Sequence, residues 1–220
     1  MTLLSDKKTL FIFDFDGVIA DSVHVKTEAF ARLYSEFGES VVQKVVDFHL
    51  QNGGMTRFEK IRYFHGELLG DKVIDQVVQD WADRFSEMVL DGVVAAEEIQ
   101  GVRKTLDFCH DNKIRCAVNS ATPESEVVEI IKRRGLSDDF EKVLGSPQSK
   151  VNNMAAILKA FGADPADAVF FGDSANDYEA AKQVKIDFIG INYNCDSQEY
   201  FPVFKNFDEF FDKISEYPGK

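Results

Sequence analysis

One short stretch constrains this chain more than any other. Four apolar residues, 10–13, run directly into Asp14, Phe15, Asp16 and Gly17. A continuous apolar run is typical of a strand buried on both faces of a parallel sheet, and ligands bind where such strands end. Two carboxylates at that point repel each other and lose water, so they need a cation such as Mg²⁺ or a retained proton. An Asp-x-Asp pair also occurs in capped turns, and this stretch alone leaves that alternative open.

The composition limits the partners of the chain. With 220 residues, 45% of them hydrophobic and 29% charged, the chain can bury one sizeable core and a smaller second one. A net charge of −13 argues against nucleic-acid backbones and anionic membranes as partners, because no basic stripe exists to displace counterions. Residues 1–8 are too short and polar for a signal peptide, and no apolar run approaches a membrane span, which predicts a cytoplasmic protein.

The segment after the first strand shows helical patterns only. Apolar residues recur at three- and four-residue steps over residues 23–37, and further helical patterns follow up to residue 69. Asp71 is the predicted N-cap of a long helix that reaches about residue 92. His49 lies within a helical pattern, and we expect it to be an ordinary packing or surface residue.

Helix and strand patterns alternate from residue 100 onwards. The predicted strands are residues 114–118, 142–144, 168–171 and 187–191. The predicted helices are residues 102–110, 122–134, 149–161, 176–184 and 207–214. In the second of these helices we expect Thr122 at the N-cap and Pro123 at the first position. Such alternation is typical of a parallel sheet covered on both faces.

The helical segment is predicted to be an insertion, because its removal would leave a continuous α/β pattern. The predicted fold class is therefore α/β, with a Rossmann-like parallel sheet and an all-helical cap. Residues 1–21 and 95–220 would form the core domain, and residues 22–94 the cap domain.

Polar residues follow three of the predicted strands at the point where each strand ends. Asp14 and Asp16 follow the first, Ser120 follows another, and Asp173 follows a third, with Asp177 four residues further on. Because parallel strands place their carboxyl ends at one edge of the sheet, we expect these side chains to converge. Taken singly, Asp177 also suits the start of a helix and Ser120 also suits a turn, so the interpretation rests on convergence.

The order of these features resembles the haloacid dehalogenase superfamily. Residues 14–22 are similar to its motif I, Ser120 to motif II, Lys150 to motif III and residues 172–177 to motif IV. The resemblance covers nearly the whole chain. The helical insertion between motifs I and II is similar to the C1 cap of subfamily I, in the branch of phosphoglycolate phosphatases and β-phosphoglucomutases.

The resemblance implies a reaction through a phosphorylated aspartate. Asp14 would be the nucleophile, and Asp16 would protonate the leaving oxygen and then deprotonate water. The implied cofactor is Mg²⁺, held by Asp14, the main-chain carbonyl of Asp16, Asp173 and Asp177, the last directly or through water.

The resemblance also implies which residues bind the transferring phosphate. These are Ser120, Ala121 and Lys150, which would act by positioning and charge. A lysine at the start of a helix opposes the helix dipole, which an anionic partner would explain. Val151 follows Lys150 where the family often has proline, so Lys142 is the alternative lysine.

Three cap-side residues are the implied determinants of substrate specificity. Gly54 and Arg57 lie in a stretch that resembles the specificity loop of β-phosphoglucomutases, in which an arginine meets a substrate phosphate. Arg57 also fits a solvated charge on a helix, and that alternative stays open. Lys26 stands where the mutase typically has a histidine, which favours hydrolysis over mutase chemistry.

The expected function is hydrolysis of a small soluble phosphomonoester. Asp16 favours phosphate esters, since the dehalogenases and the phosphonate hydrolases of this branch usually lack that aspartate. The implied partner is a small phosphorylated metabolite, similar to phosphoglycolate or a sugar phosphate. The alternatives are a β-phosphoglucomutase-like mutase and a non-catalytic binding module, and the sequence leaves the oligomeric state open.

Overall fold

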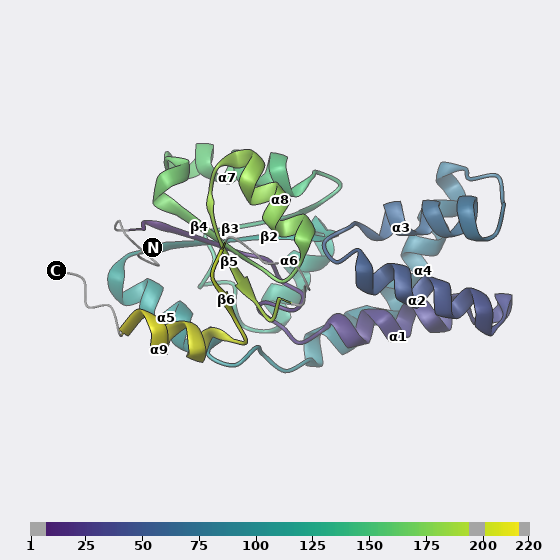
Figure 1. Cartoon of the computed structure of the whole chain (residues 1–220), viewed down its shortest axis with the longest axis horizontal. Coiled ribbons are helices and arrows are strands. Elements are labelled where there is room, and N and C mark those ends of the chain that lie inside the picture. The colour runs from purple at the N-terminus through teal and green to yellow at the C-terminus, as the bar shows by residue number, and fades with distance from the viewer. Residues whose placement is uncertain (1–7, 194–200, 216–220) are drawn as a thin grey trace.

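A buried strand, β1 (Leu10–Phe13), lies in the middle of a six-stranded parallel sheet. The structure is a computed structural model that describes residues 8–193 and 201–215. The strand order is β3-β2-β1-β4-β5-β6 (Figure 1). The neighbours of β1 are in register with it, because Phe13 lies opposite Val118 on one side and Phe171 on the other. The residues that follow these three strands therefore meet at one edge of the sheet.

The other elements of the core alternate as predicted. The strands are β2 (Arg115–Pro123), β3 (Lys142–Ser146), β4 (Ala168–Gly172), β5 (Asp187–Ile191) and β6 (Val203–Phe204). The helices are α5 (Val102–Asn112), α6 (Glu124–Arg133), α7 (Lys150–Phe161), α8 (Ala175–Val184) and α9 (Phe207–Ser215), with a 3-10 turn η3 (Pro165–Asp167) before β4. Helices α7 and α8 cover one face of the sheet, and α5 and α9 lie on the other (Figure 1). The predicted α/β class is confirmed.

The side chains of β1 alternate between two apolar layers. Leu10 and Ile12 pack with residues of α7 and α8, whereas Phe11 and Phe13 pack on the side of α9, with Phe207 among their neighbours. A strand that is apolar on both faces needs helices on both sides, because neither face can be left in water. Because β1 is held on both faces, the position of Asp14, which follows its last residue, is fixed as well.

Helices alone occupy the chain from residue 23 to residue 95. They are α1 (Val23–Leu33), η1 (Ser35–Phe37), α2 (Glu39–Gln51), α3 (Arg57–Tyr63), a π-helical turn η2 (Phe64–Leu68) and α4 (Asp75–Ala95). These helices pack against one another beyond the end of the sheet (Figure 1). We refer to this helical unit as the cap. Its exact boundaries at residues 22 and 94 stay a prediction.

The two chain passes that join the cap to the core are hydrogen-bonded to each other. The Asp21 N–H donates to the Glu97 carbonyl at 2.8 Å, and the Ile99 N–H donates to the Ile19 carbonyl at 3.0 Å. Ala20 also forms an antiparallel bridge with Glu98. The cap is thus attached through one paired, two-stranded joint.

Some predicted details are wrong. The long helix begins at Asp75 and not after Asp71, because the preceding helix continues into η2, where the Asp71 N–H donates to the His65 carbonyl at 2.9 Å. Thr122 is not the cap of α6; it belongs to β2, and Pro123 takes the N-cap position. The short strand β6 was not predicted.

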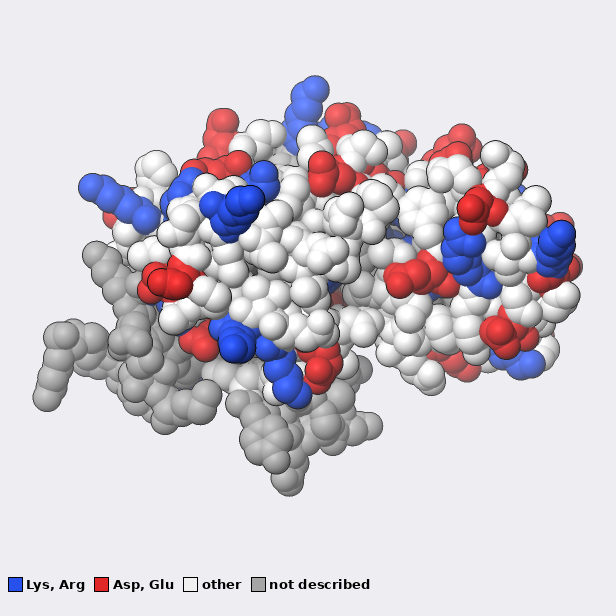
Figure 2. All heavy atoms as spheres, turned by 90° about the horizontal axis from the view of Figure 1, so that it is seen from above, with Lys and Arg blue, Asp and Glu red and all other residues white. Residues whose placement is uncertain are grey.

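The described surface carries charges of both signs. On the face shown in Figure 2, the described lysines and arginines stand among acidic residues and form no continuous basic band. Among the described helices, none combines the length and the apolar character needed to cross a bilayer. Residues 1–7, on which the prediction of a cytoplasmic location partly depends, lie outside the described residues.

Candidate active site

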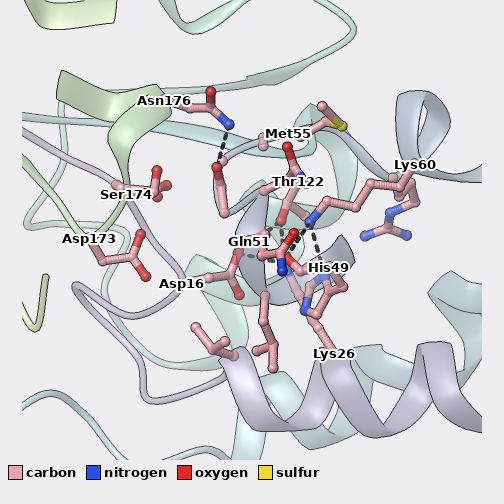
Figure 3. A pocket seen from close by; sticks show the side chains of 18 of the residues that line it. Asp16, Lys26, His49, Gln51, Met55, Lys60, Thr122, Asp173, Ser174 and Asn176 are labelled. Atoms are coloured by element: carbon pink, nitrogen blue, oxygen red, sulfur yellow. Dashed lines mark hydrogen bonds and ion pairs between the residues drawn. The ribbon is translucent and has the colours of Figure 1, made fainter. Parts of the chain in front are cut away.

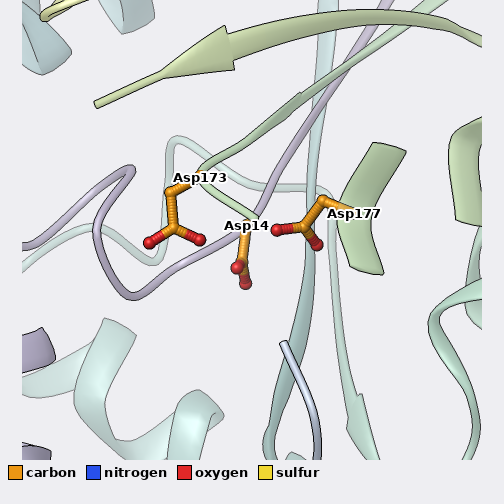
Figure 4. Close-up of side chains that lie close together, drawn as sticks. All are labelled: Asp14, Asp173 and Asp177. Carbon is orange, nitrogen blue, oxygen red and sulfur yellow. The ribbon is translucent and has the colours of Figure 1, made fainter. Parts of the chain in front are cut away.

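Three aspartates from separate segments converge at the carboxyl edge of the sheet. Asp14 follows β1, Asp173 follows β4, and Asp177 lies in the first turn of α8. Each offers an oxygen that lies within 4.8 Å of those of the other two (Figure 4). The predicted convergence of these aspartates is therefore present in the structure.

Two glycines make room for these carboxylates. Gly17 has φ +79°, and a Cβ on it would lie 2.1 Å from Asp173 Oδ2. A Cβ on Gly172 would lie 2.5 Å from the Cβ of Asp177. Since real Cβ atoms do not approach other atoms so closely, any larger residue at either position would displace an aspartate.

Asp177 is held on both of its carboxylate oxygens. Oδ2 accepts hydrogen bonds from the Ser174 hydroxyl at 2.6 Å and the Ser174 N–H at 3.2 Å, which completes a capping box at the start of α8. Oδ1 accepts from Lys150. Asp177 therefore both starts the helix and anchors the motif lysine.

Lys150 lies between two of the aspartates. It is the first residue of α7, where the Ser149 hydroxyl caps the helix, and its Nζ lies 2.8 Å from Asp14 Oδ2. Burial opposes the charge of Lys150, but Asp14 and Asp177 outweigh it and raise the lysine pKa. Lys142, the alternative lysine, lies at the opposite end of β3 opposite Ala117. The structure thus brings Lys150 to the site, and not Lys142.

The carboxylate cluster carries an excess of negative charge. Burial raises the pKa of Asp14 to about 7; Lys150 opposes this shift, and Asp177 and Asp16 add to it. Burial, followed by the charges of Asp14 and Asp177, also raises the pKa of Asp173 well above its usual range. Among the described residues, no basic side chain pairs with Asp173. An all-oxygen donor set with surplus negative charge fits a hard divalent cation such as Mg²⁺.

The Asp16 side chain turns away from this cluster and towards the cap. Its Oδ1 accepts a hydrogen bond from the Ser22 hydroxyl at 2.6 Å, and its Oδ2 accepts from Lys26 and from the Thr122 hydroxyl, the latter at 3.2 Å. Burial would raise the pKa of Asp16, but the Lys26 charge and these hydrogen bonds outweigh it and hold the pKa below the usual value. Asp16 is therefore ionised, and its side chain is not part of the three-aspartate group.

The C-terminal end of β2 presents residues other than Ser120 to the cavity. Ser120 is buried, and its hydroxyl accepts a hydrogen bond from the Thr122 N–H at 3.1 Å. Ala121 and Thr122 line the cavity. Sequence reasoning missed Thr122 as a site residue, although a hydroxyl residue just before a helix was a signal that could have indicated it.

A cavity of about 510 Å³ lies between the core and the cap. Asp14 lines it from the core. Asp16 and Asp173 also lie on its core side, and Lys26, His49 and Lys60 come from the cap (Figure 3). A cavity of this size and mixed polarity suits a small molecule.

The loop between α2 and α3 closes directly over the start of α8. The Asn176 side-chain amide donates to the Gly53 carbonyl at 2.6 Å. Gly54 has φ +75°, and a Cβ on it would lie 2.9 Å from the Ser174 hydroxyl oxygen. Gly54 thus lies at the cavity as predicted, and the close approach of the loop to α8 requires a glycine there.

Arg57 is already matched by a core carboxylate. It is buried, and it forms two hydrogen bonds to Glu126 of α6, at 2.8 and 2.5 Å, while its guanidinium lies 4.8 Å from the centre of the Phe85 ring. It also donates to the Ser86 hydroxyl. Arg57 lines the cavity, but its charge is used to join the cap to the core.

Glu126→Gln is expected to lower the free energy of unfolding by about 3 kcal/mol, because it leaves Arg57 as a buried charge without a counterion. Chemical denaturation followed by circular dichroism measures this. The exposed pair of Arg62 with Asp75 is the matched control, and Asp75→Asn is expected to change stability by less than about 0.5 kcal/mol. Equal effects of the two variants would contradict the role given to Glu126.

Sequence reasoning also missed a buried pair in the cap, His49 and Lys60. Lys60 Nζ lies 2.9 Å from His49 Nδ1 and 3.4 Å from the His49 carbonyl oxygen. Burial, followed by the charge of Lys60, lowers the pKa of His49 to about 3, so the ring is neutral. Both residues line the cavity, a position that the expectation of an ordinary packing or surface residue at His49 did not include. The lysine and the histidine lie eleven residues apart in different helices, so no sequence motif pairs them.

Curated relatives match most of the chain. A phosphoglycolate phosphatase from Psychrobacter arcticus is 29% identical over 218 residues, which cover 92% of this chain and 93% of that protein. Phosphoglycolate phosphatase 1 from Pseudomonas aeruginosa is 28% identical and covers 84% of this chain and 69% of its own. A phosphorylated carbohydrates phosphatase from Thermotoga maritima is 26% identical, and the match covers 81% of this chain and 82% of that protein.

Solved structures share the fold. A hydrolase from Pseudomonas syringae superposes with a TM-score of 0.79 at 15% identity, covering 96% of this chain and 100% of the other. A β-phosphoglucomutase from Clostridium difficile superposes with a TM-score of 0.77 at 18% identity, covering 96% and 98%. The family model described as haloacid dehalogenase-like hydrolase matches residues 11–191. Because this match spans well over half of the chain and confirms the family resemblance, the protein belongs to the haloacid dehalogenase-like hydrolases.

Proposed function

We propose that the protein is a Mg²⁺-dependent phosphatase that hydrolyses a small phosphomonoester through a phosphorylated Asp14. The observation that carries this proposal is the meeting of Asp14, Asp173 and Asp177 beside Lys150, on the core side of a cavity of about 510 Å³. The phosphatase names of the relatives support it, and the substrate would be a small phosphorylated metabolite.

Asp14 is positioned to act as the nucleophile. Its Oδ1 accepts a hydrogen bond from the Phe15 N–H at 2.7 Å, and its Oδ2 lies 2.8 Å from Lys150 Nζ. These two contacts fix the carboxylate, so that one oxygen attacks phosphorus while the bond from phosphorus to the leaving oxygen breaks. Lys150 offsets negative charge on the transferring oxygens. Mg²⁺, held by Asp14, the Asp16 carbonyl, Asp173 and Asp177, would supply the positive charge that allows a carboxylate to approach a phosphate.

Asp16 would transfer protons in both steps of the reaction, first to the leaving oxygen and then from the attacking water. Because Lys26 holds its pKa down, Asp16 is a base in the free protein. To protonate the leaving oxygen it must first be separated from Lys26 and take up a proton from solvent, so substrate binding would have to displace that contact. After the leaving group departs, ionised Asp16 takes a proton from the water that attacks the phosphorylated aspartate.

The two alternatives have less support. In the mutase alternative Arg57 would meet a substrate phosphate, but Arg57 is already paired with Glu126. Lys26, which stands where the mutase typically has a histidine, is paired with Asp16. A non-catalytic module would have no need of the buried carboxylate cluster, whose mutual repulsion is costly.

Phosphate release from a panel of phosphate esters tests the proposal. With Mg²⁺ we expect turnover of at least one small ester, and removal of the metal with EDTA is expected to abolish it.

Mg²⁺ should also raise the melting temperature, because it binds the folded state only. Since the pKa of Asp14 is raised to about 7, protons compete with the metal below that pH, and Mg²⁺ affinity is expected to fall between about pH 8 and pH 6.

The variant Asp173→Asn tests whether Mg²⁺ binds at the three aspartates. This variant is expected to lose most of the Mg²⁺-induced rise in melting temperature, because one ligand of the cluster is gone. Asp187→Asn is the control and should keep that rise, because Asp187 lies at the N-terminal end of β5, away from the edge of the sheet that holds the three aspartates. Metal-independent turnover, or isomerisation of a sugar phosphate without phosphate release, would reject the proposal.

A further inference from the structure

Most charged side chains that line the cavity have a partner of opposite charge. The pairs are Asp14 with Lys150, Asp16 with Lys26, and Arg57 with Glu126. Asp173 is assigned to the metal. Lys60 differs from all of these, because among the described residues no carboxylate lies within ion-pairing distance of its ammonium group.

Lys60 lies on the cap side of the cavity and is almost completely enclosed. Its exposed fraction is 3%, and the hydrogen-bond partners of its Nζ among the described residues are the neutral His49 ring and the His49 carbonyl. In Figure 3 the side chain extends from its helix towards the part of the cavity where His49, Thr122 and Asp16 lie. His49 therefore holds the end of Lys60 at the cavity wall without neutralising its charge.

This arrangement is unfavourable in the absence of a ligand. Burial, followed by the charge of Lys26, lowers the pKa of Lys60 to about 7. The lining of the cavity also includes the apolar side chains of Phe30, Phe85 and Met55, which offer no hydrogen bond to an ammonium group. Burying an ammonium group without a counterion is costly, and an anion in the cavity would remove that cost.

We propose that Lys60, positioned by His49, binds a second anionic group carried by the leaving-group portion of the substrate. The inference rests on the proposed phosphatase function, in which the transferred phosphate lies against Asp14 and Ala121. The remainder of the ester then extends towards the cap, where Lys60 lies. The preferred substrates are thus short phosphate esters that also bear a carboxylate or a second phosphate. Lys60 is the specificity determinant for that charge.

Matched esters test the inference in the wild-type enzyme. The probes are phosphoglycolate, its uncharged amide, and ethylene glycol bisphosphate. We expect kcat/KM to be about 30-fold higher or more for an anionic probe than for the amide, since only the former pairs with Lys60. Preference for phosphoglycolate would identify the second group as a carboxylate, and preference for the bisphosphate would identify it as a phosphate.

The variant Lys60→Met then assigns the preference to this residue. It is expected to lower kcat/KM for the preferred anionic probe about 100-fold and to change the value for the amide less than about threefold. Lys44→Met, on the exposed side of α2, is the control and should leave both values within about twofold of wild type. Lys60→Arg should recover part of the preference for the anionic probe, because the positive charge is kept.

The outcomes separate the two proposals. Turnover of none of the probes or of the wider ester panel would reject the phosphatase function itself. Equal turnover of charged and uncharged probes by the wild-type enzyme would overturn only the role of Lys60, and this comparison needs no variant to fold. An equal loss on both kinds of probe in Lys60→Met would show a structural role and would also overturn the inference.

Discussion

Asp14→Asn is expected to lower phosphate release by about 10⁴-fold or more, because the amide cannot form the phosphorylated intermediate. The protein should still fold, since the neutral side chain relieves repulsion with Asp16 and Asp177 while it gives up the contact of 2.8 Å with Lys150. Release of inorganic phosphate from p-nitrophenyl phosphate with Mg²⁺ measures the loss. Mass spectrometry of the quenched wild-type enzyme should locate the phosphoryl group on the peptide that contains Asp14.

Asp21→Asn is the matched control for this loss. Asp21 belongs to the same motif but is exposed at the joint between core and cap, so its substitution should leave turnover within about twofold of wild type. Substantial turnover by Asp14→Asn, or a phosphoryl group found on another residue, would refute the assignment of Asp14 as nucleophile.

Asp16→Asn is expected to convert turnover of p-nitrophenyl phosphate into a single burst. The nitrophenolate leaves without help from an acid, so Asp14 can still become phosphorylated, but no base remains to activate water. Steady-state turnover should therefore fall about 10³-fold, while the first turnover yields close to one nitrophenolate per active site. For an ordinary alkyl ester, which needs the acid, the burst itself should be lost.

Rapid-quench measurements resolve this burst and the phosphorylated protein that accumulates with it. Asp14→Asn provides the control without a burst. If Asp16→Asn slowed both phases equally on p-nitrophenyl phosphate, Asp16 would act in positioning rather than in proton transfer. Its contacts with Ser22, Lys26 and Thr122 make that the main competing explanation.

The parts of the fold predicted correctly depend on local patterns and on sheet geometry. The apolar run of β1 predicted a doubly buried strand, and the rule that parallel strands end at one edge predicted the meeting of Asp14, Asp173 and Asp177. Lys150 reached the site although Val151 replaces the usual proline, because Ser149 supplies the cap that starts α7.

The parts that were missed depend on contacts between distant segments. In the sequence Arg57 has no evident partner, and only the structure shows that it is hydrogen-bonded to Glu126, 69 residues later. Burial likewise lowers the pKa values of Lys60 and His49, and the spacing of apolar residues in the sequence did not indicate how deeply these two side chains are buried. The N-cap predicted at Asp71 was wrong, because its carboxylate lies 3.2 Å from His65 Nδ1 and its N–H donates to the His65 carbonyl, while the helix begins only at Asp75. Tertiary contacts override local preferences at such positions.

The paired joint between the cap and the core limits how the cavity can open. Because the passes at residues 19–21 and 97–99 are hydrogen-bonded to each other, they resist twisting more than bending. The cap should therefore swing about a single axis and carry Arg57, Lys60 and the Gly53 loop together. One such swing would break the ion pair with Glu126, lift the loop from Asn176 and withdraw Lys60 from the cavity at the same time. Substrate entry and product release would therefore both depend on this one movement of the cap.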